Sequence, residues 1–230
     1  MQNKNTYLAI IPARAGSKRL VKKNIRKLID KPLVSWSIEA AKKSKYISNI
    51  VVTSDDDDIL DIANNLDVIA FARLAELATD TSTSVDVVVD VIKKIQKEYD
   101  YIVLLQPTSP LRKEIHIDEA IELLNEKNAS AVVSVCEMEH SPLWSNTLDK
   151  TLSMNKFLNK NIINKRGQDL EQYYRLNGAI YICATEKLLD EKSFMLQENI
   201  FAYIMDKKDS IDIDEEIDFL LAEAILSAKL

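Results

Sequence analysis

The sequence predicts one α/β domain, residues 1–230, built on a parallel sheet with helices on both faces. Short apolar runs and helical patterns alternate four times between residues 7 and 136, which is the rhythm of βαβ units. The first apolar run leads into a small, basic loop, and α/β sheets bind ligands at the carboxyl ends of their strands. With 230 residues, 47% hydrophobic and 29% charged, the chain is long enough to bury one substantial core.

The first elements follow directly from periodicity. Residues 7–12 and 49–54 are apolar runs, which predicts buried strands, and residues 33–45 carry apolar side chains at helical spacing. The acidic run at residues 55–58 precedes a second helical pattern. Because acids near a helix N-terminus interact favourably with the helix dipole, we expect a helix start there rather than a metal site.

The alternation continues up to residue 136. Residues 67–71 read as a short strand, and a polar, hydroxyl-rich connection leads from them into a helix over 85–97. Residues 101–106 are predicted as a central strand that ends in QPTSPLR, where two prolines forbid regular structure. A helix over 115–126 and a strand over 130–136 complete this half of the chain.

The rhythm breaks at residues 137–174, which are polar, rich in asparagine and poorly periodic. A loop this long inside a compact domain is usually functional, so we predict a small excursion that forms a subunit interface or a lid. The sheet resumes at 177–184, a helical patch covers 186–191, and 201–205 is extended again. The chain is expected to end as a strand over 210–214 followed by an amphipathic helix.

Composition excludes several classes of protein. A net charge of −6 argues against a nucleic-acid partner, because duplex binding usually needs an extended basic face. No apolar run approaches the roughly 20 residues of a membrane span, and the N-terminus lacks a secretory signal pattern, so no membrane partner and a cytoplasmic location are expected. Cys136 and Cys183 sit in apolar strand-like runs, which favours buried, reduced thiols over a disulfide or metal pair.

The basic loop at residues 9–24 is the strongest functional signal. Eight Lys or Arg residues and a single acid occur between positions 14 and 31 of this acidic chain. Backbone amides around Gly16, the Ser17 hydroxyl, and the cations Arg14, Lys18 and Arg19 are the donors that anionic oxygens require. The loop matches neither the P-loop nor the GxGxxG pattern. A solvated basic turn is the alternative.

The motif SIDID near the C-terminus supplies carboxylates. If it forms a strand, Ser210, Asp212 and Asp214 share one face. Two carboxylates so placed can hold Mg²⁺, which typically binds through one or two carboxylates and substrate phosphates, although an edge strand with an acidic face is at least as consistent with the motif alone. Together, the loop and the acidic pair make both halves of a nucleoside-triphosphate site.

Five motifs in order resemble the CMP-sialic acid synthetase (acylneuraminate cytidylyltransferase) family, which includes CMP-legionaminate and CMP-pseudaminate synthetases. They are IIPARAGSKR with Asn24, ARLAELATDTSTS, LLQPTSPLR, YRLNGAIYI and SIDIDEEIDF. The resemblance covers nearly the whole chain. It implies a nucleotidyltransferase with a Rossmann-like, mostly parallel sheet, usually homodimeric, in which the anomeric hydroxyl of a nonulosonic acid attacks the α-phosphorus of CTP.

The resemblance also implies a role for individual residues. CTP would be bound by Arg14, Ala15, Gly16, Ser17, Lys18, Asn24, Arg73 and Ser82. The acidic sugar would be bound by Gln106, Thr108, Ser109, Arg166, Arg175 and Asn177. Asp212 and Asp214 would ligate Mg²⁺, and Arg14, Lys18, Asp212 and Asp214 would be the catalytic residues.

Three departures from the family pattern stand out. Relatives often carry a glycine where this chain has Arg19, a proline where it has Leu74, and an arginine where it has Gly167, so that Arg166 is the expected substitute for the last of these. The nonulosonic acid used and the general base stay open. A cytidylyltransferase for Kdo, or a silent sugar-nucleotide binder, are the alternatives to CMP-nonulosonate synthesis.

Overall fold

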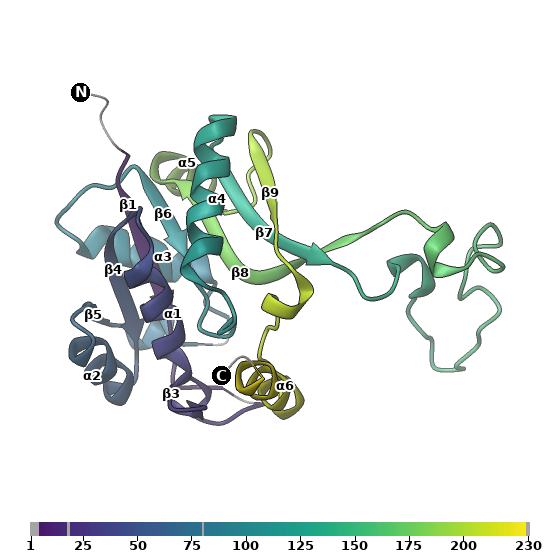
Figure 1. The fold of residues 1–230 in the computed structure, drawn as a ribbon, viewed down its shortest axis with the longest axis horizontal. Helices are drawn as coiled ribbons and strands as arrows, with labels where there is room; N and C mark the ends of the chain where they lie inside the picture. Colours follow the sequence, from purple (N-terminus) through teal and green to yellow (C-terminus); the bar gives the residue numbers. More distant parts are fainter. Residues whose placement is uncertain (1–4, 18, 80, 229–230) are drawn as a thin grey trace.

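The structure, a computed structural model, describes residues 5–17, 19–79 and 81–228. Within these residues the main sheet has seven strands, in the order β5-β4-β1-β6-β8-β7-β9 (Figure 1). In chain order they are β1 Tyr7–Pro12, β4 Ile47–Ser54, β5 Ile69–Ala72, β6 Tyr101–Leu104, β7 Ala131–Glu137, β8 Tyr174–Ala184 and β9 Ile200–Ile204. The short strands β2 Lys27–Leu28 and β3 Lys31–Pro32 form a separate antiparallel pair.

The predicted mostly parallel sheet is confirmed. Strands β5, β4, β1 and β6 are parallel neighbours, and β7 is parallel to β9. Strand β8 runs antiparallel between β6 and β7. Since β8 is the return path from the excursion, it enters the sheet from the opposite end. Its pairing with β7 shifts register between Val133 and Val135, which marks a bulge in the middle of the sheet.

Helices cover both faces of the sheet, as predicted (Figure 1). Successive side chains of a strand point to opposite faces, so β1 contributes Tyr7, Ala9 and Ile11 to one core cluster and Leu8 and Ile10 to the other. The first cluster packs against α1 Leu33–Lys43, α2 Asp57–Asn65 and α4 Glu114–Lys127. The second packs against α3 Ser84–Lys94 and α5 Thr185–Glu191.

Polar side chains cap the N-termini of α2 and α3. The Asp56 side chain accepts a hydrogen bond from the backbone N–H of Asp58, and Asp57 and Asp58 occupy the first turn of α2. The prediction that the acidic run begins a helix is therefore confirmed. Helix α3 begins at a capping box in which Thr83 and Asp86 satisfy each other's backbone N–H groups.

The strand predicted at residues 210–214 is wrong, because this segment is an extended link with no ladder to a neighbour. The Ile213 N–H donates one backbone hydrogen bond to the Thr108 carbonyl at 2.8 Å, and Ser210 is fully buried instead of sharing a face with the two aspartates. The helix predicted to follow is present as α6 Glu216–Ser227. Its Phe219 and Ala222 pack with Leu20, Leu28 and Leu33.

Residues 138–173 form an arm that extends away from the body of the molecule (Figure 1). Its described regular structure consists of two single turns of 3-10 helix, Pro142–Trp144 and Gly167–Asp169. Several apolar side chains of the arm face solvent, among them Leu152 at 69% and Met154 at 59% exposure. The arm therefore leaves apolar surface uncovered within one chain.

Two further expectations can be compared with the structure. Both cysteines are buried with free thiols, and burial raises the pKa of Cys183 to about 12. In the part of the chain that the structure describes, no helix combines the length and apolarity that a membrane span requires.

Candidate active site

A cavity of about 500 Å³ opens at the carboxyl ends of β1 and β6. Four segments surround it: the basic loop, residues 73–87 after β5, the turn after β6, and the link before α6. The residues that line it include Pro12, Arg14, Ser17, Arg19, Leu20, Lys23, Asn24, Arg73, Thr79, Ser82, Gln106, Pro107, Thr108, Asp212 and Asp214. The volume lies within the range of small-molecule sites.

Contacts to the neighbouring strand and its turn hold the basic loop in place. The Ala13 N–H donates to the Thr53 carbonyl at 3.0 Å, and the Ala15 N–H donates to Asp55 Oδ1 at 2.9 Å. Asn24 Nδ2 donates to the Arg14 carbonyl at 2.9 Å, while its buried Oδ1 has no hydrogen-bond partner. Among the residues that the structure describes, and apart from its two chain neighbours, Gly16 has no atom within 4 Å of where a side chain would begin, which leaves open space there.

Two arginines bring positive charge to the cavity from different elements. Arg14 extends from the basic loop, and Arg73 follows β5. Arg73 donates to the Thr53 carbonyl at 2.8 Å, but its Nε is buried without a partner. Burial lowers the pKa of Arg73, although the nearby Asp55 opposes this effect. Ser82 also lines the cavity, and its hydroxyl donates to the Glu76 carbonyl at 3.0 Å.

Asp212 and Asp214 both face this cavity, as the sequence predicts, although they do so without a strand. Burial raises the pKa of Asp212; the negative charge of Asp214 adds to the rise, and a hydrogen bond from Thr108 opposes it. The described residues include no cluster of three or more potential His, Cys, Asp or Glu ligands. Two carboxylates beside an anion site fit Mg²⁺, which takes its other ligands from phosphate and water.

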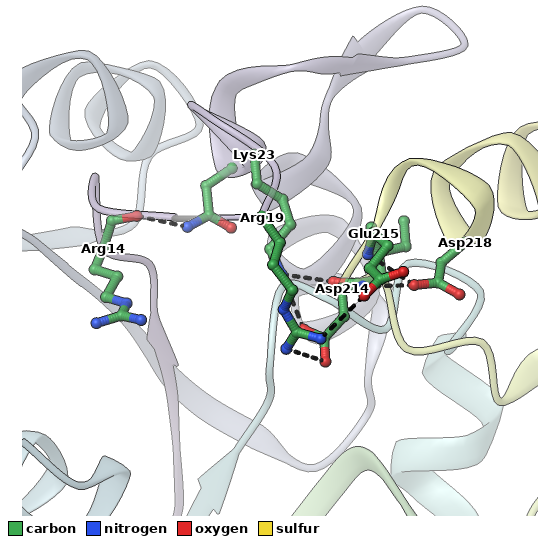
Figure 2. A network of polar contacts seen from close by, with 8 residues as sticks. Arg14, Arg19, Lys23, Asp214, Glu215 and Asp218 are labelled. Atoms are coloured by element: carbon green, nitrogen blue, oxygen red, sulfur yellow. Dashed lines mark hydrogen bonds and ion pairs between the residues drawn. The ribbon is translucent and has the colours of Figure 1, made fainter. Parts of the chain in front are cut away.

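Two cations lie beside Asp214: Arg19, which the sequence analysis named in the basic loop, and Lys23, which it did not single out. Arg19 Nη2 lies 3.0 Å from Asp214 Oδ2, and Lys23 Nζ lies 3.5 Å from Asp214 Oδ1 (Figure 2). Lys23 is only 9% exposed and donates to the Ile213 carbonyl at 2.5 Å. A lysine in the middle of a basic run carries no sequence signal for burial, so only the fold identifies Lys23 as part of the site.

The bulge in β8 supports the turn after β6 and the acidic link at the same time. Gly178 has φ of +74°, a conformation that side chains rarely adopt. A Cβ atom there would lie 3.0 Å from Gln106 Oε1 and 3.2 Å from Asp212 Oδ2. These two side chains therefore approach the backbone at a point where only glycine leaves room.

The buried side chain of Asn177, next to this glycine, joins three segments. Its Oδ1 accepts from Ser134 Oγ at 2.6 Å and from the Ala179 N–H at 3.2 Å, and its Nδ2 donates to Ser210 Oγ at 3.0 Å. Asn177 thus ties β7 and β8 to the segment that leads into Asp212. Its amide is occupied within the protein and does not line the cavity.

Comparison with known proteins decides the family, because a cytidylyltransferase family model matches residues 8–224. The chain belongs to the cytidylyltransferase family. It is 38% identical to a CMP-N,N'-diacetyllegionaminic acid synthase of Legionella pneumophila, over 95% of each chain. It is 31% identical to a pseudaminic acid cytidylyltransferase of Campylobacter jejuni, again over 95% of each. The resemblance noted in the five motifs is confirmed.

Other similarities of this cytidylyltransferase are partial or concern the fold. It is 38% identical to an N-acylneuraminate cytidylyltransferase of Escherichia coli over 96% of the chain, but it spans about half, 52%, of that relative. A structure of CMP:2-keto-3-deoxy-manno-octonic acid synthetase complexed with CTP superposes with a TM-score of 0.74, covering 98% of this chain and 100% of the other at 16% identity. That identity shows a shared fold alone.

The predicted sugar-binding residues of the cytidylyltransferase are divided in space. Gln106 and Thr108 line the cavity, whereas Ser109 is fully buried behind it. Arg175 lies 3.7 Å from Glu139, and its charge is among the groups that oppose the rise that burial causes in the pKa of Asp212. Arg166 lies on the arm, paired with Asp169 at 3.0 Å. The structure therefore gathers the predicted nucleotide residues that it describes, but not Arg166; Lys18 lies outside the described residues.

Arg112, the last residue of QPTSPLR, holds this turn from behind. It is fully buried, and Nη1 donates to the carbonyls of Gln106 at 3.1 Å and Ala179 at 2.9 Å. Nη2 donates to Ser37 Oγ at 2.5 Å. Burial lowers the pKa of Arg112 to about 9, which leaves the guanidinium charged at neutral pH. Sequence reasoning missed this residue, because an arginine after a turn is more often exposed.

We predict that Gly178→Ala disturbs the site without unfolding the cytidylyltransferase. The unfavourable positive φ and the contacts with Gln106 and Asp212 should lower the free energy of unfolding by about 1–3 kcal/mol. Urea denaturation measures this loss, and a crystal structure of the variant should show the Gln106 or Asp212 side chain displaced. Unchanged stability and unmoved side chains would contradict the role given to this glycine. Gly16→Ala, which adds a methyl group in open space, is the matched control for stability.

Proposed function

We propose that this cytidylyltransferase couples CTP to a nonulosonic acid, giving a CMP-sugar and pyrophosphate with Mg²⁺ as cofactor. The observation that carries the proposal is that one cavity is lined both by the cations Arg14, Arg73 and Lys23 and by the carboxylates of Asp212 and Asp214. The names of the relatives support the substrate class, because they refer to N,N'-diacetyllegionaminic acid, N-acylneuraminate and pseudaminic acid. The Kdo alternative has support from the fold alone, at 16% identity.

The reaction needs positions and charges rather than a covalent intermediate. The anomeric hydroxyl of the sugar loses its proton to a general base and attacks the α-phosphorus, a new P–O bond forms, and the bond from the α-phosphorus to the bridging oxygen breaks. Both electrons of that bond leave with pyrophosphate. Mg²⁺ held by Asp212 and Asp214 would neutralise charge on the phosphate oxygens. The protein cations add preorganised positive charge, which is usually the largest contribution to such a step.

Different residues of the cavity would bind the triphosphate, the nucleoside and the sugar. The open space above Gly16, the loop amides, Arg14 and Ser17 are suited to the triphosphate, and Lys18 is assigned there from its place in the motif. Asn24 Oδ1 and Arg73 Nε, both buried without partners, offer an acceptor and a donor to the nucleoside, beside Ser82. Gln106 and Thr108, which line the cavity next to Asp212, would bind the sugar.

A homodimer, in which the arm contacts a second copy, is part of this proposal. The support is the apolar surface that the arm leaves exposed, including Leu152, Met154 and Ile163. A second exposed stripe lies on α6, where Ile217, Leu220 and Leu221 recur at helical spacing. The tip of the arm, residues 150–166, carries five basic residues and no acid, whereas α6 carries three acids and no base. Opposite charges favour contact between the two surfaces.

A cytoplasmic location, where CTP is available, completes the proposal.

Pyrophosphate release tests the proposed reaction. We expect it only when CTP, Mg²⁺ and one of N-acetylneuraminic, legionaminic or pseudaminic acid are present together, and not with Kdo. A coupled phosphate assay with full kinetics over this panel also selects the substrate. The absence of release with all three acids, combined with calorimetric uptake of CTP, would identify a silent nucleotide binder instead.

We predict that Asp212→Asn separates stability from turnover. Because burial holds the pKa of Asp212 above its usual value, ionising this carboxyl costs the folded state stability at neutral pH. The variant should therefore be at least as stable as the wild type at pH 7.5, and the difference should shrink as the pH falls through the raised pKa. Pyrophosphate release should fall by about 100-fold or more. Thermal melts at pH 7.5 and 4 measure the first effect. Asp61→Asn, at an exposed position on α2, is the control.

Sedimentation tests the proposed dimer. We expect wild-type protein to sediment as a dimer at micromolar concentration. Leu221→Lys should weaken association more than Leu221→Glu, because the lysine would face the basic tip of the arm and the glutamate would not be repelled by it. A monomeric wild type, or equal effects of the two substitutions, would contradict this arrangement.

A further inference from the structure

The guanidinium of Arg19 is paired with Asp214, one of the two carboxylates proposed to hold the metal. Its Nη2 lies 3.0 Å from Asp214 Oδ2, and its Nη1 lies 3.5 Å from Glu215 Oε1 (Figure 2). The Asp214 N–H donates to Asp218 Oδ2 at 3.0 Å, which anchors the aspartate backbone at the start of α6. Asp214 is therefore fixed in place and already neutralised by a cation of the protein.

The two cations beside Asp214 differ in mobility. Lys23 has a side chain only 11% exposed and is held by the Ile213 carbonyl, so it is part of the floor of the site. The side chain of Arg19 is 62% exposed and is held through its guanidinium by carboxylates that are themselves half exposed. Exposed ion pairs of this kind are weak and exchange readily. Arg19 is thus the cation that can leave.

Arg19 also lines the same cavity as Arg14 and Ser17, on the side where the triphosphate is proposed to bind. A guanidinium that turns from Asp214 towards this space meets phosphate oxygens, which it can bind in a bidentate manner.

We propose that Arg19 is an exchangeable counter-ion, which neutralises Asp214 in the free protein and moves to the triphosphate when nucleotide and metal bind. The inference rests on the proposed function. It has one thermodynamic consequence. Because nucleotide draws Arg19 away from Asp214, and metal displaces it towards the nucleotide, each ligand should strengthen the binding of the other, by the same factor in both directions.

Binding measurements on Arg19→Ala test the exchange without relying on turnover. Free Mn²⁺, followed by electron paramagnetic resonance at low ionic strength, reports binding of the metal alone; calorimetry in the presence of a chelator reports binding of CTP alone. Removing Arg19 should tighten Mn²⁺ binding about threefold and weaken CTP binding about fivefold, the scale of a single exposed ion pair. The mutual strengthening of the two ligands should fall correspondingly. Both effects should diminish at high salt, because exposed charges are screened.

Two matched variants separate this role from a general change in charge. Lys27→Ala removes an exposed cation from the same basic segment and should leave both affinities unchanged. Arg19→Lys keeps the charge and should restore CTP binding in part. Unchanged or weaker Mn²⁺ binding in Arg19→Ala would overturn the proposal, as would CTP binding equal to that of the wild type. A wild type that couples Mn²⁺ and CTP but makes no CMP-sugar would remove the proposed function and leave this inference standing.

Discussion

The buried amide of Asn177 is the interaction on which the arrangement of the site depends. It bonds to Ser134 on β7 and to Ser210, so it joins the central sheet to the link that carries Asp212 and Asp214. An unsatisfied buried donor or acceptor costs about 1–3 kcal/mol, so a link that drifted away from this amide would leave both partners unpaired. Gly178, the next residue, gives Gln106 and Asp212 room to approach. One irregular point in β8 thus positions both sides of the cavity.

The chemistry of the site comes from bringing opposite charges together across the chain. The cations lie in the basic loop after β1, whereas the carboxylates lie almost 200 residues later, and the contact between Arg19 and Asp214 spans 195 positions. Each cluster alone would repel itself. Because the two clusters line one cavity, their charges neutralise each other in the free protein. A metal can then pair with the carboxylates, and a triphosphate with the cations. The same arrangement makes exchange of counter-ions a natural part of ligand binding.

Much of the fold follows from local patterns, and the failures have a common cause. Strand β1 begins and ends where the apolar run does, and the acidic run starts a helix, because both effects are local. Residues 210–214 alternate like a strand but join no strand of the sheet, because distant groups hold them instead: Asn177 bonds to the Ser210 hydroxyl, and the Thr108 carbonyl accepts from the Ile213 N–H. Arg112, Lys23 and Asn177 are polar residues that become buried only because carbonyls or side chains from distant segments receive them.

The sequence by itself determined the class of fold, the basic loop, the acidic pair and, through five ordered motifs, the family. These depend on residue type and spacing, which are properties of the chain alone. Only the tertiary structure decided that Arg19 and Lys23 neutralise Asp214, that Asn177 supports the site from within, and that Arg166 stands apart on the arm. Such contacts join segments far apart in sequence, and whether two side chains meet depends on the packing of everything between them.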